Sequence, residues 1–85
     1  MEGINPKLRD PAWLQLARIL ESRIRSGHYP RDERLPSEAG LMREFEVGRT
    51  TVRLALAELR KRGLVETVST RGTYVVKGLP APSAD

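Results

Sequence analysis

The spacing of apolar residues changes at Gly63, and this change constrains the fold more than any other feature of the sequence. Before Gly63, apolar side chains recur every three or four residues, which is typical of amphipathic helices. After it, residues 64–68 and 73–76 are rich in the β-branched and aromatic side chains that favour strands. Residues 69–72 separate the two runs, and we expect Gly72 to supply a positive φ in a hairpin connection. A two-stranded ribbon is marginal alone, so it must pack on the helices.

Two helices are predicted in the first half of the chain. The first begins at about Pro11 and stops before Gly27, a residue type that is common just past a helix end. The second is short and follows Ser37, which is the expected N-cap. Its apolar face holds Leu41 and Phe45.

A third helix follows after a tight turn at residues 46–48. Gly48 is the expected N-cap of this helix, and the helix is expected to end at residues 61–63. Two helices joined by a short turn form a helix-turn-helix. The predicted fold class is therefore α+β, a winged helix-turn-helix of three helices followed by a two-stranded β-hairpin wing. The residues that the third helix is expected to bury are Val52, Ala55, Leu56 and Leu59.

The composition excludes several classes of function. The 85 residues contain no Cys and only one His, so we expect no metal, no cofactor and no catalytic site. The sequence also lacks a nucleophile paired with a base and a glycine-rich phosphate loop, which makes an enzyme the least supported class. No apolar run approaches the roughly 20 residues of a membrane span. We therefore expect a cytoplasmic protein, of bacterial origin, with no membrane partner.

Positive charge is concentrated in one third of the chain. Residues 1–48 hold eight basic and eight acidic side chains, whereas residues 49–77 hold seven basic and two acidic ones. A local excess of this kind is expected where a protein meets a polyanion. A solvated basic face is the simpler alternative, and charge alone does not separate the two.

The residues that open the third helix suit a DNA groove better than they suit a helix. A helix N-terminus favours acidic side chains, yet this one begins with Arg49, and the β-branched Thr50 and Thr51 have low helix propensity. Arginine can pair bidentately with guanine, and threonine can bond phosphate or contact a thymine methyl. Residues 50–53 therefore predict a DNA-reading surface. Arg71 at the hairpin tip is likewise suited to a narrow minor groove.

Several motifs in the same order resemble the DNA-binding domain of GntR-family bacterial transcription regulators. The resemblance covers about residues 11–76. It implies that the third helix enters the major groove and that the wing tip reaches the minor groove. The motifs are Leu35-Pro36-Ser37-Glu38, Val47-Gly48-Arg49-Thr50-Thr51-Val52-Arg53, Ala55-Leu56, Leu59, Gly63-Leu64-Val65 and Arg71-Gly72-Thr73-Tyr74-Val75.

The chain departs from the family pattern at two places. The family motif commonly continues with Arg-Glu after Leu-Pro-Ser-Glu, and that Arg touches DNA, whereas this chain has Ala39 and Gly40. One expected contact is therefore missing. The family often has a polar residue after the second arginine, whereas this chain has Leu54, which in a groove could pack on a thymine methyl.

The predicted contacts fall into three groups. Arg49 and Arg53 match the base-reading arginines of the family. The assigned residues are Arg49, Thr50, Arg53 and Leu54 at the major groove, Ser37 and Thr51 at phosphates, and Arg71 and Gly72 at the minor groove.

Members of the family usually bind palindromic operators as dimers and act mostly as repressors. The resemblance therefore implies double-stranded operator DNA and a second copy of the protein as partners.

The predicted organisation is a flexible arm at 1–10, the winged helix at 11–77 and a linker or disordered tail at 78–85. GntR-type proteins usually carry a C-terminal domain that binds a small-molecule effector. This chain is either a domain cut at its linker or a short regulator that works without one. The alternative function is a winged helix that binds another protein, which predicts an exposed apolar patch and little salt dependence.

Overall fold

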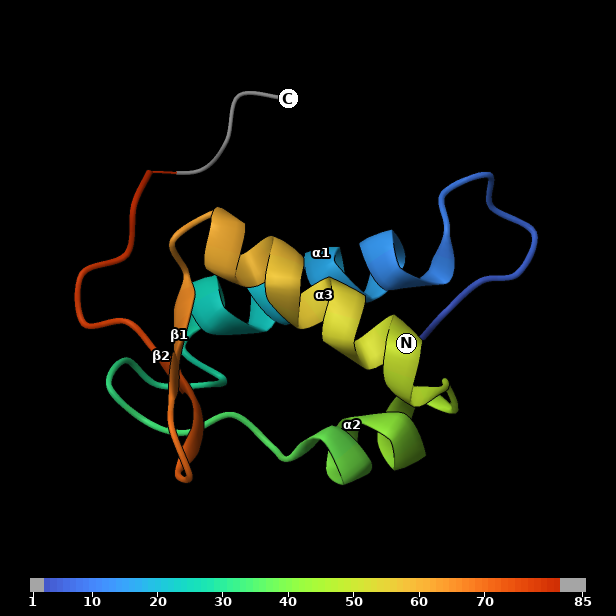
Figure 1. Cartoon of the computed structure of the whole chain (residues 1–85). Coiled ribbons are helices and arrows are strands. Elements are labelled where there is room, and N and C mark those ends of the chain that lie inside the picture. The colour runs from blue at the N-terminus through green and yellow to red at the C-terminus, as the bar shows by residue number, and fades with distance from the viewer. Residues whose placement is uncertain (1–2, 82–85) are drawn as a thin grey trace.

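The computed structural model describes residues 3–81 and has the predicted architecture (Figure 1). Its elements in chain order are α1 (Ala12–Ser26), α2 (Glu38–Phe45), α3 (Arg49–Lys61), β1 (Val65–Val68) and β2 (Gly72–Val75). The winged helix-turn-helix is therefore confirmed. Residues 1–2 of the predicted arm and residues 82–85 of the predicted linker lie outside the described residues.

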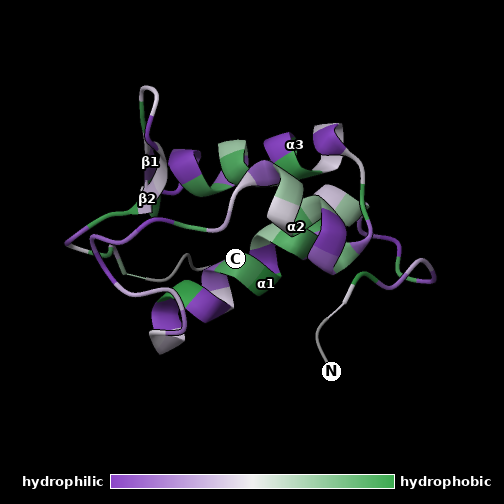
Figure 2. Ribbon diagram, turned by 90° about the horizontal axis from the view of Figure 1, so that it is seen from below, coloured by the Kyte–Doolittle hydropathy of each residue, from purple (hydrophilic) through white to green (hydrophobic). Residues whose placement is uncertain are grey.

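One apolar core joins all the elements. The apolar faces of the three helices turn toward one another, and the hydrophilic faces turn outward (Figure 2). The wing closes one end of this core through Leu64, Val65 and Val75, all of which are buried. The four residues predicted to line the inner face of α3 are all buried. The largest fully buried side chains are Leu16, Leu20, Ile24, Leu41, Val52, Leu59, Leu64 and Val75.

The helix ends follow the sequence closely. Gly27 ends α1 with a φ of 86°, a left-handed conformation that glycine adopts without strain. The Ser37 hydroxyl accepts a 3.1 Å hydrogen bond from the Gly40 amide and so caps α2 as predicted. Between α2 and α3 the chain turns through Glu46, which has a φ of 55°, and Gly48 is the N-cap of α3. This turn sets the angle between the two helices of the helix-turn-helix.

The hairpin has an unpredicted third segment at its base. β1 and β2 are antiparallel, with Val65 opposite Val75 and Val68 opposite Gly72. Residues 32–35 run along the other side of β2: the Leu35 amide donates to the Thr73 carbonyl at 2.8 Å, and Arg34 forms an isolated bridge with Tyr74. The segment that leads into α2 therefore pairs with the wing and fixes its base relative to the helices.

Two contacts fasten residues near the ends of the described chain. The Gln15 side chain bonds the backbone of Asn5 through both its amide nitrogen and its oxygen, at 3.0 and 2.8 Å. At the other end, Arg25 Nη1 donates to the Pro80 carbonyl at 2.8 Å. The flexibility predicted for residues 1–10 and 78–85 stays a prediction.

Candidate nucleic-acid interface

One face of α3 is solvent-exposed along the first half of the helix. Because an α-helix repeats every 3.6 residues, positions 49, 50, 53 and 54 share one side. All four predicted major-groove residues at these positions are exposed, and Leu54 is exposed to 46%. Thr51 is only half-buried and lies at the edge of this face. We call Arg49, Thr50, Arg53 and Leu54 the α3 face.

Glu38 at the start of α2 ties the two arginines of the α3 face. Its Oε2 accepts a 3.0 Å bond from Arg53 Nε, and its Oε1 lies 3.8 Å from Arg49 Nε. All three side chains are more than a third exposed, so water screens the pairs and each contributes about 0–1 kcal/mol at most. No contact of Glu38 was assigned from the sequence. The pairing depends on the angle between α2 and α3, which no local pattern in the sequence reveals.

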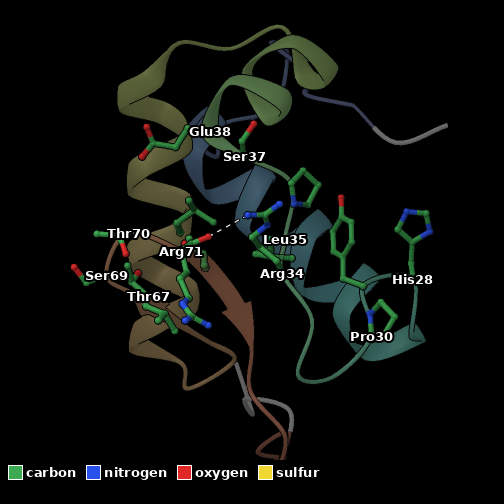
Figure 3. Close-up of a pocket in the computed structure, with 16 residues that line it drawn as sticks. His28, Pro30, Arg34, Leu35, Ser37, Glu38, Thr67, Ser69, Thr70 and Arg71 are labelled. Carbon is green, nitrogen blue, oxygen red and sulfur yellow. Dashed lines mark hydrogen bonds between the residues drawn. The ribbon is translucent and has the colours of Figure 1, made fainter.

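Ser37 keeps part of its hydrogen-bonding capacity. Its oxygen accepts from the Gly40 amide, but a hydroxyl also has one hydrogen to donate. The residue is exposed and lies beside Glu38 (Figure 3). Capping and a phosphate contact are therefore compatible at this position.

The wing tip presents Arg71 on a tight three-residue turn. The Arg71 amide donates to the Val68 carbonyl at 3.0 Å, and Thr70 has a φ of 65°. Gly72 has a φ of 124°, so the predicted positive φ is confirmed. Within residues 3–81 the exposed Arg71 side chain makes no hydrogen bond or ion pair. It is available to an external partner.

Two further arginines at the wing were not predicted as site residues. Arg60, in the last turn of α3, donates from Nη1 to the Thr67 hydroxyl of β1 at 3.1 Å. Arg34 donates from Nη1 to the Arg71 carbonyl at 3.2 Å (Figure 3). The sequence places these partners 7 and 37 positions apart, and only the folded chain brings them together.

Residues 3–81 contain no group of three or more potential metal ligands from His, Cys, Asp and Glu. None of the helices formed by these residues has the length and apolar character that a membrane crossing requires.

Comparisons with known proteins agree on one family. Residues 13–75 match the model of the "Bacterial regulatory proteins, gntR family". The chain is 37% identical over 75 residues to the arabinose metabolism transcriptional repressor of Geobacillus stearothermophilus, covering 88% of this chain and 21% of the relative. It is 36% identical over 75 residues to the HTH-type transcriptional repressor NagR of Bacillus subtilis (strain 168), covering 88% of this chain and 31% of the relative. The chain thus spans less than a third of either curated relative.

A solved structure is also similar to this chain in its fold. The DNA-binding domain of AraR in complex with the operator ORX1 superposes with a TM-score of 0.81 at 31% sequence identity. The match covers 89% of this chain and 96% of that domain.

Proposed function

Because this chain belongs to the GntR family of bacterial regulatory proteins, we propose that its winged helix reads a specific double-stranded operator and serves a transcription repressor in the cytoplasm. In this proposal the α3 face enters the major groove and the wing tip enters the adjacent minor groove. Arg49, Thr50, Arg53 and Leu54 contact bases. Ser37 and Thr51 contact phosphates, and Arg71 with Gly72 contacts the minor groove.

The observation that carries the proposal is the exposure of the whole α3 face. Folding alone does not explain Arg49 and Thr50 in the first turn of a helix, where acidic side chains are stabilising. Base-edge recognition explains them, because guanidinium forks and hydroxyls match the donors and acceptors of the major groove. Three large apolar side chains are exposed within residues 3–81, and they lie in separate parts of the chain: Leu8 precedes α1, Leu54 is on α3 and Val68 ends β1. They give little support to the alternative of an apolar protein-binding patch.

We further propose that two copies act on one operator and that an effector binds elsewhere in a longer protein. The named repressors support this because they are more than three times as long as the matched segment. A single small domain also offers a limited contact area, so two copies are needed for tight binding.

Selection from a random duplex pool, followed by titration of the selected duplex at several salt concentrations, tests the proposal. If four to six phosphates are neutralised per domain, log K against log salt should have a slope of about −4 to −5. An unselected duplex of equal length is the control and should bind more weakly. No enrichment of any sequence together with a flat salt response would contradict DNA binding and favour a protein partner.

A further inference from the structure

A groove separates the wing from the start of α2. The turn of the wing lines one side with residues 67–73, and residues 28–30 and 34–38 line the other side (Figure 3). Leu56 of α3 also contributes to its lining. We call it the Arg34 groove, because the Arg34 guanidinium lies within it.

The backbone of Arg34 is fixed and its side chain crosses the wing at Gly72. Pairing with β2 holds residues 32–35 in place, as described above. A Cβ built on Gly72 would lie 3.0 Å from Arg34 Cδ, so the stem of the arginine occupies the space that only a glycine leaves open. The guanidinium has five N–H donors, and Nη1 makes its one hydrogen bond within residues 3–81, to the Arg71 carbonyl. Donors remain for an anion.

Duplex geometry leads a phosphate strand into this groove. The major and minor grooves of DNA are separated by one sugar-phosphate strand. If the α3 face occupies the major groove and the wing tip the adjacent minor groove, that strand must cross between them. At Glu38 and Leu56 the Arg34 groove adjoins a smaller hollow that Arg53 of the α3 face also lines, and this hollow connects the groove to the α3 face.

The charges around the groove favour a phosphate. Arg34 and Arg71 both line it. Glu38 is its only carboxylate among residues 3–81, and Arg53 and Arg49 already balance that charge. His28 lies on the far rim next to Tyr29. A phosphodiester placed on Arg34 therefore faces an excess of cations.

We infer that Arg34 binds a phosphate of the strand that lies between the two grooves, and that its bond to the Arg71 carbonyl holds the wing tip at the minor groove. This inference rests on the proposed function. It assigns Arg34 two tasks, phosphate ligand and positioning residue for the wing. Because phosphate contacts carry no sequence information, Arg34 should affect all DNA sequences alike.

Arg34→Ala tests the phosphate contact, with Arg31→Ala as the matched control. Arg31 is exposed in the same loop, lies outside the groove and makes no hydrogen bond or ion pair within residues 3–81. Removing one phosphate contact should weaken binding about tenfold at low salt and make the salt slope shallower by about one. The base preference at the positions read by α3 should not change. Arg31→Ala should leave both affinity and slope unchanged.

Arg34→Lys and amide hydrogen exchange separate the two tasks. Lysine keeps the charge, so Arg34→Lys should bind with the same salt slope as the parent. This slope can be measured even if the alanine variant proves too unstable. In the free protein, the amides of Arg71 and Gly72 should exchange faster in Arg34→Ala than in the parent or in Arg31→Ala.

Two outcomes overturn the inference without touching the proposed function. If the parent binds its selected duplex with a steep salt slope and Arg34→Ala keeps that slope, Arg34 is not a phosphate ligand. If the slope changes while the exchange of the wing amides does not, the positioning task is wrong. Salt-independent binding by the parent itself would instead contradict the proposed function.

Discussion

At the scale of single residues, the two arginines of the α3 face form ion pairs with Glu38 that are weak enough to break when DNA binds. The exposed ion pairs of Arg49 and Arg53 with Glu38 are each worth about 0–1 kcal/mol. A bidentate contact between arginine and guanine is worth about 1–3 kcal/mol of discrimination. The correct base can therefore outcompete the carboxylate, whereas a base without matching acceptors cannot.

Replacing Arg49 or Arg53 by Ala should remove about 1–3 kcal/mol of discrimination at one base pair each, because each arginine is expected to read one guanine. Selected sequence preferences, measured for each variant against the parent, check this. Arg31→Ala serves as the control, because Arg31 lies outside the proposed interface. Unchanged preferences in both variants would mean that these arginines contact only phosphates.

Gly72 should tolerate no side chain, for two separate reasons. Its φ of 124° lies where other residues are strained, and an added Cβ would displace the Arg34 stem. We expect Gly72→Ala to lower the free energy of unfolding by about 1–3 kcal/mol and also to weaken DNA binding. Gly78→Ala is the matched control, because a Cβ there meets nothing within 4 Å and its φ is not positive. Thermal melting and operator titration of both variants give the answer, and equal behaviour of the two would contradict this role.

At the scale of elements, the wing is more firmly built at its base than at its tip. Val65 and Val75 are buried in the core at the base, and residues 32–35 pair with β2 from Val75 to Thr73. The tip carries exposed side chains, including Arg71. Stability and the proposed DNA contact are therefore divided along the length of the hairpin.

Arg71→Ala should weaken operator binding and leave the melting temperature nearly unchanged. An exposed substitution of this kind usually changes stability by no more than about 0.5 kcal/mol, whereas a narrow minor groove attracts an inserted guanidinium. Affinity for operators with and without A·T pairs opposite the wing, measured beside the melting curve, checks the prediction. Parental affinity in the variant would show that the wing is only structural.

The sequence predicted the elements better than the contacts between them. Helix caps, helix faces and the hairpin turn are local, so Ser37, Gly27 and Gly72 could be assigned from their neighbours in the chain. The pairing of residues 32–35 with β2 could not be predicted, because Arg34 and Tyr74 are 40 positions apart and no alternating pattern marks the short segment. The bond between Arg53 and Glu38 was missed for the same reason. Most contacts that arrange the site are long-range, and they exist only once the helices are packed.

At the scale of the whole molecule, ion pairs also join α1 to the end of α3. Arg62 bonds Glu58 at 2.7 Å and Glu21 at 2.8 Å, and Glu21 also pairs with Arg25. The hydrogen bond to Glu58 is the main cause of a raised pKa for Arg62. Arg62 therefore stays charged, but its charge is paired within the domain. The basic excess of residues 49–77 is thus only partly available to DNA.

Joining two copies of the chain by a flexible linker should increase affinity for a full palindromic operator by about 10²–10⁴ over one copy, because the second contact becomes intramolecular. A half-site should show no such gain, since it offers one binding position. Titration of single and joined copies against half and full operators provides the comparison. Equal affinities of single and joined copies for the full operator would contradict a two-copy arrangement.

The ion pairs of Glu38 also bear on how quickly a regulator finds its operator. A genome offers about 10⁶–10⁹ competing sites, so the time spent on wrong sequences limits the search. By occupying both arginines, Glu38 should shorten each visit to a sequence that cannot displace it. Glu38→Gln should lengthen these visits and raise the affinity for a random duplex by no more than about fivefold, which is the equivalent of one exposed ion pair. Dissociation rates from the random duplex measure this directly, and an unchanged rate would mean that Glu38 plays no part in the search.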